Sequence, residues 1–346
     1  MNGNQKHRLH LSRRPSGFKE IARYPVLPLP ERAAAIRIDT LIAVLPLYLL
    51  SVYHYGFRPI TIALISAVMM MGLDIAAKTI LKKETRFDIS PAATGLIIAL
   101  FLPASAPLWL PIVTAVFATA VSYVPTERIK VTFSAAALSL LSSFLLFPGI
   151  MNVIPEASYK LDPFALTLKH FRAIPASPIE KVLSGHLPDM TTFETFFGLG
   201  SARIGEISGF LIVLSFIYLL VRRTAKPVLP LSFILTIGIF AYLNPSLEAA
   251  SDAIAFDGAI YNAFGSNTVL VTAFLLSKPS RSAKTTLGTV ILGITGGLVT
   301  MLLRGIVSVG LTALIAVVFI DLALPLIDRF IAPTPFGGKI TPLKKE

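Results

Sequence analysis

The sequence predicts an all-α, polytopic integral membrane protein with about ten transmembrane helices. Of its 346 residues, 54% are hydrophobic and only 14% are charged, whereas a soluble domain carries about 25% charged residues. The mean hydropathy is +0.74. Apolar runs long enough to cross a bilayer follow one another with short polar breaks. We therefore expect one integral membrane domain rather than several soluble domains.

Ten predicted spans cover most of the chain. A transmembrane helix needs about 20 mostly apolar residues, or somewhat fewer where protein encloses it. The spans are 38–54, 59–78, 90–103, 107–124, 131–148, 206–221, 228–244, 258–277, 285–303 and 307–327. The third is short and contains Gly95, which is typical of a half-helix or re-entrant segment. Spans one to five and six to ten fit two five-helix repeats, as in many transporters, but the similarity between the halves is too weak to establish a repeat.

Positive charge predicts the orientation. Ten spans place both ends of the chain on one side, and the loops then assigned to the cytoplasm hold most of the 31 Lys and Arg residues, as the positive-inside rule requires. We expect an inner (plasma) membrane protein with a basic cytoplasmic tail at 1–37, a membrane domain at 38–330 and a cytoplasmic tail at 331–346. Because the charges lie between the spans, they predict orientation in the lipid bilayer and not nucleic-acid binding.

Several kinds of chemistry are excluded by composition. The chain has no cysteine, which excludes disulfides, thiolate metal sites, iron–sulfur ligation and a cysteine nucleophile. Its five histidines are scattered, and none pair at ligand spacing. No P-loop, GxGxxG or GxSxG pattern occurs, so a nucleotide-driven transporter or a soluble hydrolase has no support.

The longest outside connection, 149–205, holds two candidate sites. Ser177 stands between Pro175 and Pro178. A rigid, exposed hydroxyl suits covalent modification, and the alternative is an ordinary turn serine.

The second candidate is the stretch at the start of span six, with Gly200, Ser201, Gly205 and Glu206. Its glycines allow close backbone approach, and a helix N-terminus here would be an anion or phosphate site that Glu206 could cap. The alternative is a loop-to-helix junction without a ligand.

Span three opens with a helix-capping pattern. Asp88 or Ser90 is expected to cap the helix, with Pro91 in its first turn. Thr94 and Gly95 lie one turn further on, where they would face either a cofactor or a packed helix.

Asp74 and Asp321 lie inside predicted spans, where ionisable side chains are costly and usually functional, whereas Asp39 is close enough to the N-terminal tail to be interfacial. Asp74 has Lys78 one turn later on the same helix face, so it is either part of an ion path or an anchor at the cytoplasmic end of its span. Asp321 is flanked by apolar residues and faces either a polar pathway or the membrane interface.

The order of several motifs resembles one known family. The segment 87–100 reads FDISPAATGLIIAL and is followed by Leu102-Pro103, which is similar to the D-x-S-x-x-x-T-G-L-L-x-A-L-x-L-P signature of the RnfD/NqrB family of membrane flavoproteins. Further matches at family spacing are 204–208 (IGEIS), 218–220 (YLL), 231–233 (LSF), 325–328 (PLID) and 336–337 (FG). The resemblance runs from about residue 30 to 338 and is closer to the RnfD branch.

The resemblance implies a flavin in the long outside loop. In this family a flavin transferase joins FMN through its phosphate to a hydroxyl in an S-G-A-T motif. The corresponding stretch here makes Ser177 the acceptor, although Pro175 replaces the motif's glycine. Two other family patterns are altered, at 123–128 and at 278–281, where Lys278 replaces an aspartate. A second, non-covalent flavin is also compatible with the resemblance.

The function implied is that of a membrane subunit of an Rnf-type complex, which is not an enzyme alone. Such complexes pass electrons between ferredoxin and NAD and move Na⁺ or H⁺ across the membrane. Expected partners are iron–sulfur and other membrane subunits, together with the flavin transferase. The alternative is a flavin-free channel, transporter-like protein or scaffold of the same fold, which the altered motifs would suit.

Overall fold

We analysed a computed structural model of the chain. The structure describes residues 30–82, 88–123, 131, 133–156, 160–168, 171, 173–174, 191–244, 252–304 and 306–331. Five of the described helices are long and apolar enough to cross a membrane, and five shorter helices are also apolar. Their outward faces carry exposed large side chains such as Leu45, Leu64 and Leu235, which is the pattern of a multi-pass membrane protein whose surface meets lipid.

The helices fall into two sequential groups separated by the long connection. The first group contains α1 (Pro30–Tyr55), α2 (Arg58–Ile80), α3 (Ser90–Leu100), α4 (Leu110–Ser122), α6 (Ala135–Leu146) and the short α7 (Pro148–Met151). The connection includes α9 (Thr192–Phe197). The second group contains α10 (Gly209–Val221), α11 (Val228–Leu243), α12 (Asp252–Phe264), α13 (Ser266–Leu270), a π-helix η3 (Val271–Leu276), η4 (Pro279–Arg281), α14 (Thr286–Leu303) and α15 (Val309–Phe330).

Each predicted span corresponds to helical structure, with two differences. α1 begins at Pro30, so the predicted boundary at 37 falls inside a helix. The reason is that residues 31–35 are Glu, Arg and Ala, which all favour helix although the segment is too polar for the bilayer core. The eighth span, 258–277, is broken at Gly265, which separates α12 from α13 and η3.

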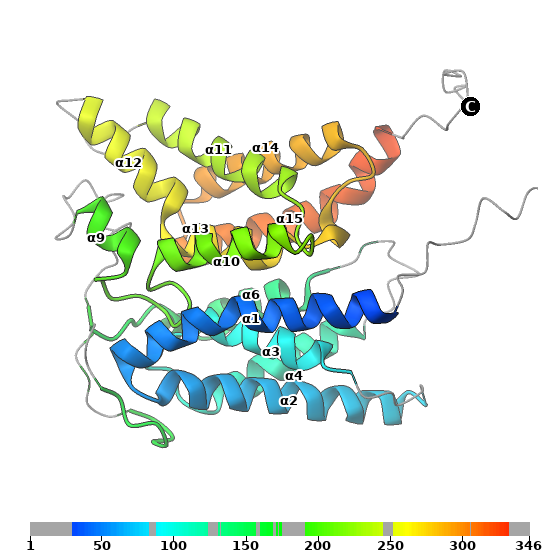
Figure 1. Ribbon diagram of the computed structural model, residues 1–346, viewed down its shortest axis with the longest axis vertical. Coiled ribbons are helices and arrows are strands. Elements are labelled where there is room, and N and C mark those ends of the chain that lie inside the picture. Colours follow the sequence, from blue (N-terminus) through cyan, green and yellow to red (C-terminus); the bar gives the residue numbers. More distant parts are fainter. Residues whose placement is uncertain are drawn as a thin grey trace, which may run out of the picture.

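The two groups form two halves with the same internal packing (Figure 1). In the first half α2 packs against α3 and α4, and α4 packs against α6. In the second half α11 packs against α12 and α14, and α14 packs against α15. The halves meet where α1 contacts α10 and α6 contacts α15. Corresponding helices thus have corresponding neighbours, as two five-helix repeats would require.

Small residues allow the closest helix contacts. A Cβ on Gly293 of α14 would lie 1.8 Å from the Ser232 hydroxyl of α11, and one on Gly297 would lie 2.8 Å from the Thr236 side chain. Backbones that approach this closely gain van der Waals contact, which is a main source of helix association in lipid.

Candidate functional site

The half-helix α3 ends inside the protein, where the segment 200–208 crosses it. A helix end leaves carbonyl groups without intrahelical partners, and no water reaches them here because Leu100 and Leu102 are fully buried. The backbone N–H of Gly205 donates to the Leu100 carbonyl at 2.7 Å, and that of Ile204 donates to the Leu102 carbonyl at 3.2 Å. The crossing segment therefore supplies the hydrogen bonds that let α3 stop within the membrane domain.

Gly205 is required for this crossing. A Cβ at this position would lie 2.7 Å from the Leu100 Cβ and 3.0 Å from the Leu100 carbonyl oxygen. The close backbone approach predicted from the sequence therefore occurs, and it is an approach between two segments of the protein. A flavin contact at Gly205 stays a prediction.

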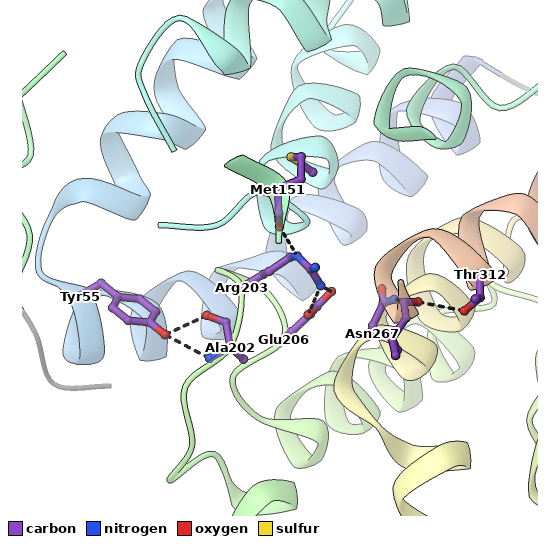
Figure 2. Close-up of polar contacts among 8 residues, drawn as sticks. Tyr55, Met151, Ala202, Arg203, Glu206, Asn267 and Thr312 are labelled. Carbon is purple, nitrogen blue, oxygen red and sulfur yellow. Dashed lines mark hydrogen bonds and ion pairs between the residues drawn. The ribbon is translucent and has the colours of Figure 1, made fainter. Parts of the chain in front are cut away.

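Two side chains of α1 hold the crossing segment from the other side. The Tyr55 hydroxyl donates to the Ala202 carbonyl at 2.8 Å and accepts from the Ala202 N–H at 3.1 Å (Figure 2). The Ser51 hydroxyl donates to the Ile204 carbonyl. These contacts fix the position of the charged residues that follow.

A buried ion pair lies in the crossing segment. Arg203 Nη1 is 3.1 Å from Glu206 Oε2, and the two residues are only 6% and 4% exposed. The Arg203 guanidinium also donates to the Met151 carbonyl at 3.3 Å (Figure 2). It lies 5.0 Å above the Phe144 ring. A Cβ on Gly310 of α15 would lie 2.9 Å from the same guanidinium. The pair is therefore placed between both halves of the molecule.

The expectation that Glu206 caps the helix at span six is wrong. The Ser208 hydroxyl caps α10 by accepting from the Leu211 N–H at 3.3 Å, because Ser208 directly precedes the first helical residue. The expected anion site at this N-terminus stays a prediction. A Cβ on Gly209 would lie 2.9 Å from the Phe196 ring and 3.4 Å from the Phe264 carbonyl, so Gly209 packs closely against both residues.

Gly200 and Ser201 lie at the beginning of the crossing segment. Gly200 is buried and Ser201 is half-buried. Their predicted contact with a cofactor stays a prediction.

The other predicted residues of α3 face different surroundings. The Asp88 carboxylate accepts from the Ser90 N–H at 2.9 Å at the start of α3, whereas the residue at the capping position is Ile89, which makes no side-chain capping bond. The Thr94 hydroxyl donates to the Ser90 carbonyl within the helix. A Cβ on Gly95 would lie 2.7 Å from the Ser66 carbonyl oxygen of α2, so Gly95 faces a packed helix. Flavin binding by Thr94 and Gly95 stays a prediction.

Asp74 and Asp321 each form an ion pair with a positively charged side chain. Asp74 lies 2.5 Å from Lys78 Nζ, as the spacing predicted, and accepts from the Tyr123 hydroxyl at 2.7 Å. Asp321, 1% exposed, lies 2.9 Å from Arg281 Nε and accepts from the backbone N–H of Ser134 at 2.8 Å. Their place in an ion path stays a prediction.

Sequence reasoning missed the residues that complete these sites. Arg281 and Ser134 are distant from Asp321 in sequence, and no local pattern marks them as its partners. Asp39 of α1 was expected to be interfacial, and its partner was missed: it lies 3.0 Å from Arg222 at the end of α10. A polar residue in the first predicted span was the only available signal.

Ser177 lies outside the described residues. The described part of the same connection carries an aromatic cluster formed by Phe193, Phe196 and Phe197 of α9 with Phe210 of α10. The rings of Phe197 and Phe210 stack with centroids 5.2 Å apart, and both side chains are exposed. A flat aromatic surface of this kind fits the isoalloxazine ring of a flavin, since aromatic rings favour offset stacking.

Comparison with known proteins identifies the family. The sequence is 28% identical to the D subunit of the Na(+)-translocating ferredoxin:NAD(+) oxidoreductase complex of Acetobacterium woodii, covering 90% of this chain and 93% of that protein. It is 23% identical to the D subunit of the ion-translocating oxidoreductase complex of Psychromonas ingrahamii, covering 88% and 94%. The match to the NQR2, RnfD, RnfE family extends over residues 21–337. The chain therefore belongs to the NQR2, RnfD, RnfE family.

Proposed function

We propose that this chain is the D subunit of an ion-translocating oxidoreductase complex in the inner membrane. The observation that carries the proposal is its similarity, along nearly the whole length of both chains, to the D subunits of such complexes. The complex transfers electrons between ferredoxin and NAD and moves Na⁺ or H⁺ across the membrane. Iron–sulfur subunits and other membrane subunits are its partners.

Ser177 is the proposed attachment point of FMN. A flavin transferase would join the Ser177 oxygen to the FMN phosphate of FAD, with loss of the hydroxyl proton and release of AMP. Bound FMN supplies the electron-transfer chemistry, whereas the protein positions it. The exposed aromatic rings of Phe197, in the same connection, and of Phe210, in the adjoining α10, support this proposal because they offer a stacking surface.

The proposed ion path includes Asp321, where the two halves meet, and Asp74, which lies within the first half. The broken helices α3 and α12–α13 support this proposal, because irregular backbone at membrane depth usually lines a binding site or pathway. Asp74 and Asp321 are the carboxylates proposed to contact the ion. Asp74 is paired with Lys78 and Asp321 with Arg281. An ion can therefore contact either carboxylate only when its lysine or arginine partner moves away.

In-gel flavin fluorescence tests the attachment. Chain produced together with a flavin transferase is expected to give a fluorescent band after denaturing electrophoresis. The Ser177→Ala variant is expected to lose the band, and the matched Ser184→Ala variant in the same connection is expected to keep it. No fluorescence in the unmodified chain would favour the flavin-free alternative. Fluorescence that persists in Ser177→Ala would place the ester on another hydroxyl.

A further inference from the structure

Buried arginines in the described residues are compensated in different ways. Arg203 is paired with Glu206, and Arg281 with Asp321. The Arg58 guanidinium donates to four backbone carbonyls, those of Ala104, Ala106, Asp162 and Ala165, and the negative charge of Asp162 also acts on it. Such compensation is needed because an unpaired buried charge is strongly destabilising.

Arg304 is the exception among them. It directly follows α14 and is 4% exposed. One guanidinium nitrogen donates to the Asn262 side-chain oxygen, and another donates to the Thr268 hydroxyl at 2.6 Å. Both acceptors are neutral, the structure places no carboxylate of the described residues in an ion pair with Arg304, and its Nε is buried without a partner. Among the described side chains, the positive charge of Arg304 therefore has no carboxylate counterion.

A second unpartnered polar group lies in the same turn. The Ser308 hydroxyl is buried and has no hydrogen-bond partner. Ser308 occupies the capping position of α15, yet its side chain accepts no backbone hydrogen bond. One short turn between α14 and α15 thus holds two unsatisfied groups that can both donate hydrogen bonds to an anion.

The residues around this turn leave the Arg304 guanidinium available to an anionic ligand. Asn267 at the start of α13 donates to the Val309 carbonyl at 3.0 Å, which joins the break in α12–α13 to the first residue of α15. The guanidinium of Arg203, which a Cβ on Gly310 in the first turn of α15 would approach to 2.9 Å, is paired with Glu206. Beside Asn262, a Cβ on Gly258 of α12 would meet no atom within 4 Å, so this side of α12 has space for a ligand.

We propose that Arg304 and Ser308 bind a phosphate group, with Asn262 and Thr268 holding the guanidinium in place. A planar guanidinium and a hydroxyl donor suit phosphate oxygens, and charge-assisted hydrogen bonds to them are strong. The site is at the end of the molecule where α9 lies (Figure 1). The phosphate belongs either to a phospholipid headgroup or to the FMN of the long connection.

Lipid binding to the full-length Ser177→Ala chain tests the site without a tethered flavin. Phosphatidylglycerol is added to the purified protein in nonionic detergent, and bound lipid is counted by native mass spectrometry. Adding Arg304→Gln is expected to weaken the tightest binding by about tenfold or more. Ser308→Ala is expected to cause a smaller loss, and the exposed-arginine control Arg223→Gln none.

The melting temperature gives a second test, because the direction of its change is predicted for each variant. Without lipid, Arg304→Gln is expected to melt no lower than its parent, because it removes an uncompensated buried charge. Phosphatidylglycerol is expected to raise the melting temperature of the parent but not of Arg304→Gln. Unchanged lipid affinity in folded Arg304→Gln, or in Ser308→Ala if the first variant does not fold, would overturn the proposal.

The flavin-loaded chain with Ser177 distinguishes the two sources of phosphate. If Arg304-dependent lipid binding persists in that chain, the ligand is a phospholipid. If it is present only in Ser177→Ala, the tethered FMN phosphate occupies the site. A chain that carries no flavin at all would contradict the proposed attachment, yet the comparison of Arg304→Gln with its parent would still decide whether the phosphate site exists.

Discussion

At the scale of single residues, two glycines in the first half differ in what a side chain would meet. A Cβ on Gly95 would lie 2.7 Å from the backbone oxygen of Ser66, whereas one on Gly72 would meet nothing within 4 Å. We expect Gly95→Ala to push α3 from α2 and to cost about 1–3 kcal/mol of stability. Gly72→Ala should instead stabilise its helix by up to about 1 kcal/mol. Thermal unfolding followed by the fluorescence of the single tryptophan, Trp109, measures both, and equal effects would contradict the packing described.

The buried pair of Arg203 and Glu206 allows a prediction about charge. Glu206→Gln leaves the Arg203 guanidinium buried beside Phe144 without its carboxylate, and we expect a loss of about 3–5 kcal/mol. The double variant Arg203→Met with Glu206→Leu removes both charges and should recover most of that stability. A double-mutant cycle by thermal unfolding measures the coupling. If Glu206→Gln costs no more than the double variant, the pair does not compensate the buried arginine.

At the scale of elements, α9 is started by a reciprocal capping box. The Glu194 carboxylate accepts from the Thr191 N–H at 2.8 Å and from its hydroxyl at 3.0 Å, while the Glu194 N–H donates back to that hydroxyl. The backbone hydrogen bond from Thr191, followed by that from its hydroxyl, lowers the pKa of Glu194 below 4.5. The contribution to helix stability is therefore present above pH 4.5 and is lost as the pH falls through the lowered pKa.

Hydrogen exchange measures this loss. Amide protection factors in α9 should decrease between neutral pH and pH values below 4.5 in the unmodified chain. The Glu194→Gln variant cannot titrate at this position, so its α9 should be less protected at neutral pH and should show a weaker dependence on pH. The same dependence in both chains would rule out Glu194 as its source.

The elements show how far sequence reasoning reaches. Apolar runs predicted all ten membrane segments, because burial in lipid requires length and hydrophobicity, which are local properties. The half-helix at 90–103 was also predictable from its length and its glycine. The segment that satisfies the end of α3 was not predictable, because Gly205 donates to the Leu100 carbonyl from a distant part of the chain. For the same reason the spacing of Asp74 and Lys78 predicted their pair, whereas nothing local joined Asp321 to Arg281.

At the scale of the whole molecule, the interface between the halves carries carboxylates that each reach the other half. Asp39 of α1 lies 3.0 Å from Arg222 after α10, and Asp321 of α15 accepts from Ser134 before α6. The odd number of predicted spans in each half, five, reverses the direction of the second half, so α1 and α10 run antiparallel (Figure 1). The described chain consequently begins and ends at the same end of the molecule, opposite α9 (Figure 1).

This arrangement predicts which side of the membrane each loop occupies. The chain has no cysteine, so one introduced cysteine is the only thiol. Positive charge at the chain ends and in the loop of Ser280 favours the cytoplasm for these segments. In spheroplasts a membrane-impermeant maleimide should label Ser184→Cys directly, and Ser280→Cys only after permeabilisation.

Lys345→Cys is the control for the number of spans, because it should behave like Ser280→Cys if α14 and α15 both cross the membrane. Labelling of Ser280→Cys in intact spheroplasts would reverse the orientation. It would also place the connection that holds Ser177 in the cytoplasm. A flavin on Ser177 would then lie on the cytoplasmic side of the membrane and not at its outer face. The labelling pattern thus tests the orientation of the fold and the position of the proposed flavin with the same three variants.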